Sequence, residues 1–147
     1  MDARRLRALE ATLGHRFADA PLLERALTHA SYAHEHPPAT DQDPLAFVGD
    51  AALGLVVAER LLAQCPAAPV GVLTPARADV VSGANLARWA AALELGALVR
   101  LGRGEELSGG RERESILATT LEALLGVMYL EVGLDGVRRT VARLAGW

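Results

Sequence analysis

The stretch DPLAFVGDAALGLVVAERLLAQ, residues 43–64, decides the fold. Asp43 followed by Pro44 is typical of a helix start, with an N-cap residue before a proline at the first helical position. The residues that follow are apolar almost all round, which predicts a helix in the middle of a domain. Cys65-Pro66 ends this helix, because proline cannot continue it.

A second apolar helix is predicted over residues 115–132, which contain ILATTLEALLGVMYLE and begin at Ser115. Gly133 stops this helix, and Asp135 is expected to cap a last helix that runs to about residue 144. Two central apolar helices indicate a core built from helix packing rather than from a sheet.

The rest of the chain also has helical patterns and no strand periodicity. Further helices are expected over residues 2–13 (closed by Gly14), 20–31 (capped by Asp19), 74–91 (capped by Thr74) and, as a short turn, 93–99. Residues 34–44 and 101–113 are expected to be loops, the latter glycine-rich and exposed. We therefore expect an all-α fold with one domain over residues 1–147.

Composition limits the classes of function. The chain has 147 residues, a formal net charge of −3 and only arginine among its 15 basic residues. A domain that holds nucleic acid by overall charge is usually basic, so any such role must rest on a local patch. A single cysteine excludes an intrachain disulfide, and no signal peptide or apolar run of roughly 20 residues is evident. A cytoplasmic protein that does not enter a membrane is expected.

Each central helix contains one acid among apolar residues, namely Asp50 and Glu122. A charge on an apolar helix face is costly unless it is paired or binds a metal. Acids that converge from two packed helices can hold a hard cation such as Mg²⁺, and Gly49 inside the first helix favours close packing there. A solvated groove or a pairing with a distant arginine would explain either acid equally well.

Five ordered segments of the chain resemble the ribonuclease III family. They are LEATLGHRFADAPLLERALTHASYAHEH, DPLAFVGDAALGLVVAERL, LTPARADVVSGANLARWA, the loop LGRGEELSGGRER and the helix ESILATTLEALLGVMYL. The resemblance implies an all-helical homodimer that cleaves double-stranded RNA with Mg²⁺. It also implies four metal-binding acids, one pair on each central helix.

This sequence departs from the family pattern at two of those four positions. Ala46 and Thr119 stand where the family has an acid, whereas Asp50 and Glu122 are kept. Asp43 replaces a further glutamate of the family signature and is also explained as a helix cap. A cage with two of its four carboxylates should bind Mg²⁺ weakly or not at all, because alanine offers no ligand and threonine only a neutral hydroxyl.

Three functions are compatible with this half site. The first is a ribonuclease III-like domain that interacts with double-stranded RNA but has lost most or all cleavage. The second is a slow or Mn²⁺-preferring nuclease that uses Asp50 and Glu122, helped by Asp43 or by the RNA phosphates. The third is a structural or ribosome-associated dimer module in which the two acids form an internal hydrogen-bond network.

The surfaces for RNA and for a second subunit are also predicted. The candidate RNA contacts flank the glycine-rich loop, and a second group of arginines lies near the end of the chain: Arg100, Arg103, Arg111 and Arg113, then Arg138, Arg139 and Arg143. No double-stranded-RNA-binding domain is expected in this sequence, so a separate RNA-binding protein is a hypothetical partner. The resemblance implies that Phe47 inserts into a partner subunit. His29 and Tyr32 are expected to be packing or polar core residues.

Overall fold

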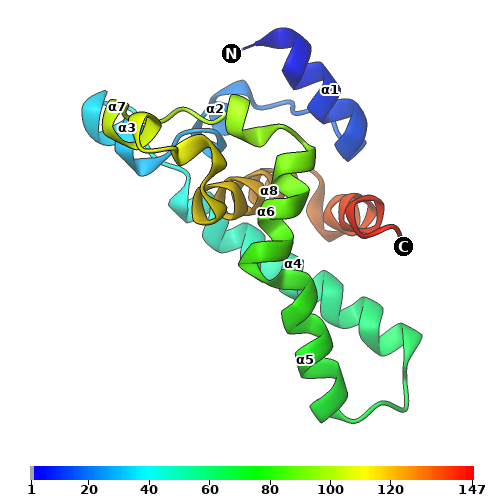
Figure 1. The fold of residues 1–147 in the computed structure, drawn as a ribbon. Coiled ribbons are helices and arrows are strands. Elements are labelled where there is room, and N and C mark those ends of the chain that lie inside the picture. Colours follow the sequence, from blue (N-terminus) through cyan, green and yellow to red (C-terminus); the bar gives the residue numbers. More distant parts are fainter. Residues whose placement is uncertain (1) are drawn as a thin grey trace.

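The structure, a computed structural model that describes residues 2–147, is all-helical (Figure 1). Within these residues there is no strand, only one isolated parallel bridge between Thr28 and Arg100. The elements are α1 (Ala3–Leu13), α2 (Ala20–Ala26), α3 (Ala30–Glu35), α4 (Asp43–Gln64), α5 (Val70–Val81), α6 (Gly83–Ala92), η1 (Leu95–Ala97), α7 (Arg103–Leu107), η2 (Gly110–Glu112) and α8 (Glu114–Ala145).

The core is centred on the crossing of α4 and α8, the pair of elements with the most extensive contact. Two glycines lie at the crossing. A Cβ added at Gly49 would lie 1.7 Å from the backbone oxygen of Glu122, and one added at Gly126 would lie 2.1 Å from the backbone oxygen of Leu45. The two backbones therefore touch directly, and only glycine at both positions allows this approach.

Several helix boundaries that the sequence predicts are confirmed. Gly14 ends α1 with a left-handed conformation (φ 69°), and the Asp19 side chain accepts a hydrogen bond from Leu22 at the start of α2. Helix α4 spans residues 43–64 as expected. Gly133 interrupts α8 with a non-helical conformation (φ 68°, ψ −170°), which a residue with a Cβ rarely adopts.

Two predicted helices were wrong in detail. The helix expected over residues 20–31 is two helices, because the side chain of His29 caps a new one at Ala30. The helix expected over residues 74–91 begins at Val70 and not at Thr74, and it breaks at Ser82. Ser82 has extended dihedral angles, and its hydroxyl accepts from the Asn85 N–H, so it ends α5 and caps α6.

Two smaller expectations were also wrong. The loop expected over residues 101–113 contains α7 and η2, and the Glu35 carboxylate accepts from the Arg103 N–H at the start of α7. Asp43 is the first residue of α4 rather than its N-cap, which is Gln42. The Asp43 N–H instead donates to the side chain of Asp41 at 3.0 Å.

Helix α5 and the last turns of α4 project from the rest of the molecule as an arm (Figure 1). Although α5 is largely apolar, none of its residues is buried. Val70 and Val72 are 76% and 56% exposed. A helix of this composition normally packs its apolar side chains against another element. In the single chain, the arm leaves these side chains uncovered.

Helix α8 is long and apolar enough to meet the length and hydropathy of a membrane-spanning helix. However, 61% of its most apolar window is buried inside the protein, and Gly133 breaks the helix. These properties are those of a core helix.

Replacing Gly49 by alanine should strongly destabilise the fold, because the added methyl would force α4 away from α8. We expect the free energy of unfolding to fall by about 3 kcal/mol or more in urea denaturation, at or above the upper end for overpacked cores. Gly54→Ala on the same helix is the matched control. A Cβ there meets nothing within 4 Å, so this change should stabilise by up to about 1 kcal/mol. Equal effects of both changes would contradict the close-packing role of Gly49.

Candidate functional site

Asp50 and Glu122 do come together where α4 crosses α8. Asp50 follows Gly49, whose Cα lies against the backbone oxygen of Glu122, and the Asp50 charge acts on the Glu122 carboxyl. The two side chains differ in burial, since Glu122 is half-buried whereas Asp50 is exposed. The expectation that both acids are embedded in apolar surroundings was therefore wrong for Asp50, which faces solvent from α4.

The environment of Glu122 raises its pKa to about 7, from an ordinary value of 4.5. Burial is the larger cause, because desolvation penalises the charged carboxylate, and repulsion by Asp50 adds to it. Glu122 therefore holds a proton for much of the time near neutral pH. A divalent cation would have to displace that proton before both carboxylates could act as ligands.

The other two positions of the expected cage supply no carboxylate. Ala46 lies one turn before Asp50 and is only 6% exposed, as part of the hydrophobic core. Thr119 lies one turn before Glu122 and is half-buried. Asp43 is exposed at the start of α4. Over residues 2–147 no group of three or more His, Cys, Asp or Glu side chains is placed to hold a metal ion. The residues present therefore do not fit a tightly bound Mg²⁺.

The sequence did not point to Gln42, a fully buried polar residue one turn before Ala46. Its side-chain oxygen accepts a hydrogen bond from the Thr120 hydroxyl at 3.2 Å, and that hydroxyl also lies 2.8 Å from the backbone oxygen of Ile116. Its amide nitrogen, Nε2, has no partner. The pair joins α4 to α8 beside the acids. Nothing in the sequence distinguished Gln42 from the polar loop that precedes it.

Most of the arginines predicted to contact RNA are engaged within the protein. Arg100 pairs with Glu24, donates to the Thr28 hydroxyl at 2.6 Å and lies 4.7 Å from the ring centre of Tyr32. Arg111 donates to the backbone oxygens of Gly96 (2.7 Å) and Val99 (2.9 Å).

The same holds for Arg113, which pairs with Glu105 and is within reach of Ser108. Arg103 differs, because its side chain is exposed and only its backbone N–H is bound, by Glu35. The three paired guanidinium groups hold the 100–113 segment in place. A role of these residues in RNA binding stays a prediction.

His29 and Tyr32 pack as expected. The Nδ1 atom of His29 accepts from the Ser31 N–H at 3.2 Å and caps α3, and burial lowers the His29 pKa from its ordinary 6.5. Tyr32 lies between two partners, the His36 ring at 4.0 Å and the guanidinium of Arg100. Both residues stabilise α3 at its N-terminal end.

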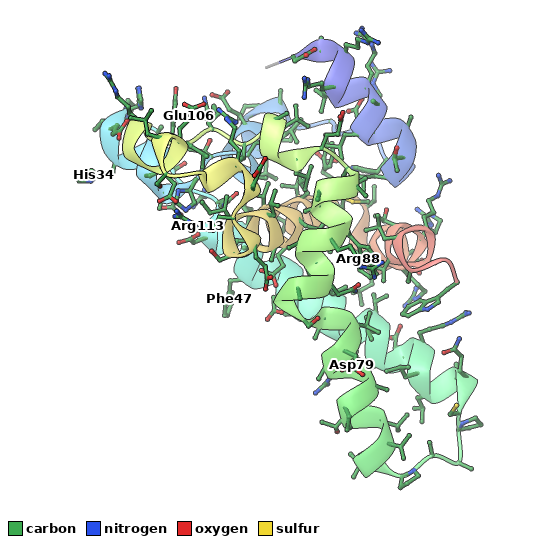
Figure 2. The ribbon with its side chains drawn as sticks, viewed as in Figure 1. His34, Phe47, Asp79, Arg88, Glu106 and Arg113 are labelled. Atoms are coloured by element: carbon green, nitrogen blue, oxygen red, sulfur yellow. The ribbon has the colours of Figure 1, made fainter. Side chains whose placement is uncertain are left out.

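Phe47 is left uncovered by the described residues 2–147. It is 80% exposed and projects from α4 away from the rest of the molecule (Figure 2). Leu55 and Leu62, two and four turns further along the same helix, are 47% and 53% exposed. With Ala51 and Ala58 between them, they form an apolar row that we call the outer face of α4. This row is continuous along the helix up to the arm.

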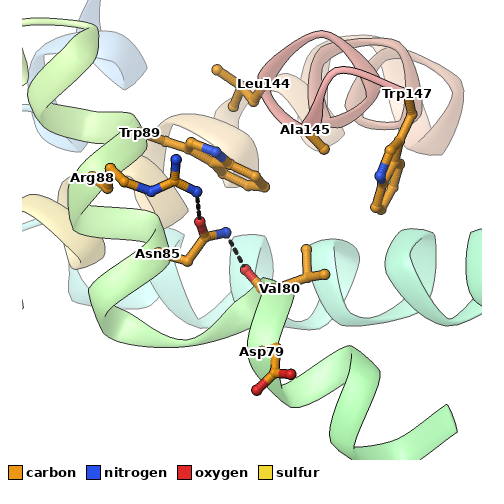
Figure 3. Close-up of a pocket in the computed structure, with 8 residues that line it drawn as sticks. All are labelled: Asp79, Val80, Asn85, Arg88, Trp89, Leu144, Ala145 and Trp147. Atoms are coloured by element: carbon orange, nitrogen blue, oxygen red, sulfur yellow. Dashed lines mark hydrogen bonds between the residues drawn. The ribbon is translucent and has the colours of Figure 1, made fainter. Parts of the chain in front are cut away.

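A hollow of about 290 Å³ lies away from the two acids, between α5, α6 and the end of α8 (Figure 3). Trp89 and Trp147 line it, together with Arg88 and Asn85, and neither Asp50 nor Glu122 does. The Asn85 side chain donates to the Val80 backbone oxygen at 2.7 Å and also bonds to Arg88. The Asn85 amide thus fixes the bend between α5 and α6, so these hydrogen bonds have a structural role.

A sequence profile described as Ribonuclease-III-like matches residues 19–145. The chain belongs to this family. The family membership and the all-helical fold that the sequence segments implied are therefore confirmed.

Solved structures agree with the fold of this ribonuclease III-like chain. The nuclease domain of ribonuclease III from Campylobacter jejuni superposes with a TM-score of 0.89 at 35% identity, covering 98% of this chain and 94% of that one. A second structure of that domain, described as showing flexibility in a region involved in dimer formation, gives a TM-score of 0.88 at 36% identity. It covers 95% of this chain and 94% of that one.

Curated relatives are named Ribonuclease 3. The protein of Streptomyces coelicolor is 49% identical over 92% of this chain and 49% of its own length. That of Syntrophobacter fumaroxidans is 46% identical over 95% of this chain and 58% of its own length. The chain thus spans about half the length of the curated relatives it matches.

The raised pKa of Glu122 makes the stability of the fold depend on pH. Between pH 4.5 and about 7 the folded state keeps a proton that the unfolded chain has released. The free energy of unfolding must therefore fall as pH rises through this range. Glu122→Gln should remove the fall and leave the variant more stable than the wild type above pH 7, in urea denaturation across a pH series.

Asp50→Asn provides the matched test of the second cause of the raised Glu122 pKa, which is repulsion by the Asp50 charge. Without the Asp50 charge, the pKa of Glu122 should move down and the pH-dependent fall in stability should shrink without disappearing. If both variants kept the wild-type dependence of the free energy of unfolding on pH, this would contradict the proximity of the two carboxyl groups.

Proposed function

We propose that this chain is a ribonuclease III-like domain that takes part in processing of double-stranded RNA as a dimer, with RNA cleavage lost or strongly reduced. The observation that carries the proposal is the half site at the α4–α8 crossing. Asp50 and Glu122 are together, but Ala46 and Thr119 supply no carboxylate and Glu122 is partly protonated near neutral pH. We further propose that it works in the cytoplasm, as a cytosolic RNA-processing domain would.

Loss of two acids affects metal binding more than the number alone suggests. The two missing carboxylates would have contributed two negative charges to the cage, and the remaining pair is held as a single charge when Glu122 is protonated. A cation of charge +2 then meets about one negative charge instead of four. Mg²⁺ gives up its hydration water reluctantly, so it has little reason to exchange water for this site.

A reduced active site is the second candidate function. It is favoured by the exposure of Asp50, which leaves one carboxylate accessible to a cation carried in by RNA phosphates. Mn²⁺ tolerates such a site better than Mg²⁺ when phosphate oxygens complete the coordination. A nuclease of this kind would be slow and would depend on both Asp50 and Glu122.

Restoring the missing acids tests the proposal. We expect wild-type protein to leave long double-stranded RNA uncleaved in Mg²⁺, whereas Ala46→Glu combined with Thr119→Asp should cleave it. The control adds Glu122→Gln to that double variant and should be inactive again. Circular dichroism with and without Mg²⁺ shows whether the restored variant is folded, because Ala46 is a core position.

Cleavage by the wild type that is lost in both Asp50→Ala and Glu122→Ala would contradict the loss of catalysis and establish the second candidate. No binding of double-stranded RNA by the wild type would instead contradict the RNA-processing role and leave a structural module.

Dimerisation through the outer face of α4 is part of the same proposal. An aromatic side chain that is 80% exposed, within a row that includes Leu55 and Leu62, is typical of an interface anchor. A second copy fits this row because a two-fold axis pairs the same face with itself. The solved nuclease domain of C. jejuni ribonuclease III, whose fold this chain shares, is described as having a region involved in dimer formation.

Phe47→Ala should shift the protein towards monomer in sedimentation velocity, with a dissociation constant raised at least about tenfold, as for an interface hot spot of 1.4 kcal/mol or more. Leu107→Ala is the control, because Leu107 is similarly exposed (78%) but lies on α7. A dimer weakened equally by both changes, or by neither, would contradict the anchor role of Phe47.

A further inference from the structure

The charges of this chain are divided unevenly between its middle and its ends. Residues 2–17 and 131–147 contain seven arginines and four acids, a formal charge of +3. Residues 18–130 contain eight arginines and fourteen acids, a formal charge of −6. The net charge of −3 therefore conceals a basic part and an acidic part.

The two basic ends are joined in space, where α1 meets the last part of α8 (Figure 1). The Thr140 hydroxyl on α8 donates to the backbone oxygen of Leu13 at 2.9 Å. Near this bond, the Arg143 guanidinium lies over Gly14, so closely that an added Cβ would be 2.6 Å from its Cζ. His15 Nε2 and Glu131 Oε2 lie 2.6 Å apart and fix the same corner.

Exposed arginines gather at this corner. Arg139 and Arg143 lie one turn apart on one face of α8, and Arg16 follows two residues after Gly14. Arg7 lies two turns before Gly14 on the same face of α1. We call these four residues, Arg7, Arg16, Arg139 and Arg143, the tail patch. All four are exposed, and none has an ion-pair partner among residues 2–147.

The neighbouring acids are engaged with other groups. Glu131 accepts from the Ala18 and Asp19 N–H groups besides its contact with His15, and Glu10 accepts from the Phe17 N–H. Asp135 pairs with Arg138, which also binds Glu59. Arg138 is therefore neutralised, although it adjoins Arg139 in sequence. The guanidinium groups of the tail patch remain available to an external anion.

We propose that the tail patch, rather than the glycine-rich loop, is the principal surface through which this chain holds the phosphate backbone of RNA. Guanidinium groups bind phosphate oxygens in bidentate pairs, and such contacts carry sequence-independent affinity. The loop has three of its four arginines committed to internal bonds, whereas the tail patch has none. The inference rests on the proposed RNA-binding function and adds the location of that binding.

Two triple variants with the same change in charge test the location. Arg16→Gln, Arg139→Gln and Arg143→Gln together remove three of the four arginines of the tail patch. Arg77→Gln, Arg88→Gln and Arg103→Gln remove three exposed arginines elsewhere, including Arg103 of the loop. Binding of a fluorescein-labelled RNA duplex is measured by anisotropy from 50 to 200 mM salt. Thermal unfolding confirms that both variants are folded.

The tail-patch variant should lose affinity at least about tenfold at 50 mM salt, and the slope of log affinity against log salt should flatten by two to three units, roughly one per lost phosphate contact. The other triple variant should change affinity less than about threefold. Equal losses of RNA affinity in both triple variants would show that binding depends on net charge alone. A loss of affinity confined to the Arg77, Arg88 and Arg103 variant would place the RNA elsewhere on the surface. Either result would overturn the proposal that the tail patch binds RNA. Absence of binding by the wild type would instead contradict the proposed function itself.

Discussion

The direct contact between the backbones of α4 and α8 determines both the packing of the core and the position of the two acids. Gly49 and Gly126 remove the side chains that would otherwise separate the two helices, so that each helix lies against a carbonyl oxygen of the other. The contact fixes the core, and it also brings Asp50 and Glu122 near each other. The cost is electrostatic, because two carboxyl groups are then held close together with one of them half-buried.

In a cage with four acids, a divalent cation would compensate that repulsion. Here the compensation takes another form, since Ala46 joins the hydrophobic core and Glu122 retains a proton near neutral pH. Under the proposed function this site needs no cation, because Ala46 adds no charge and Glu122 is partly protonated near neutral pH. The packing of α4 on α8 is made by the two glycines and by apolar side chains.

Much of this was predictable from the sequence. The apolar runs around residues 43–64 and 115–132 predicted the two central helices, and Gly49 indicated close packing near Asp50. The exposure of Asp50 was not predictable, because helical periodicity does not show which side of a nearly all-apolar helix lacks a neighbour. The same limit applied to α5, whose apolar residues are exposed in the single chain. The break at Ser82 was missed because a serine is an ordinary helix residue until its neighbours select it as a cap.

The arginines show a second limit of the sequence. The sequence gives no difference between two groups of arginines, namely Arg100, Arg111 and Arg113, and Arg16, Arg139 and Arg143. Only the structure separates the first group, whose guanidinium groups are bound internally, from the second, whose guanidinium groups are free.

The half site of Asp50 and Glu122 is tested most directly by isothermal titration calorimetry of the wild-type protein with Mg²⁺. We predict no binding at millimolar Mg²⁺ and pH 7. A stoichiometric binding isotherm that releases about one proton and disappears in Glu122→Gln would contradict it, because the half site would then hold the metal on its own.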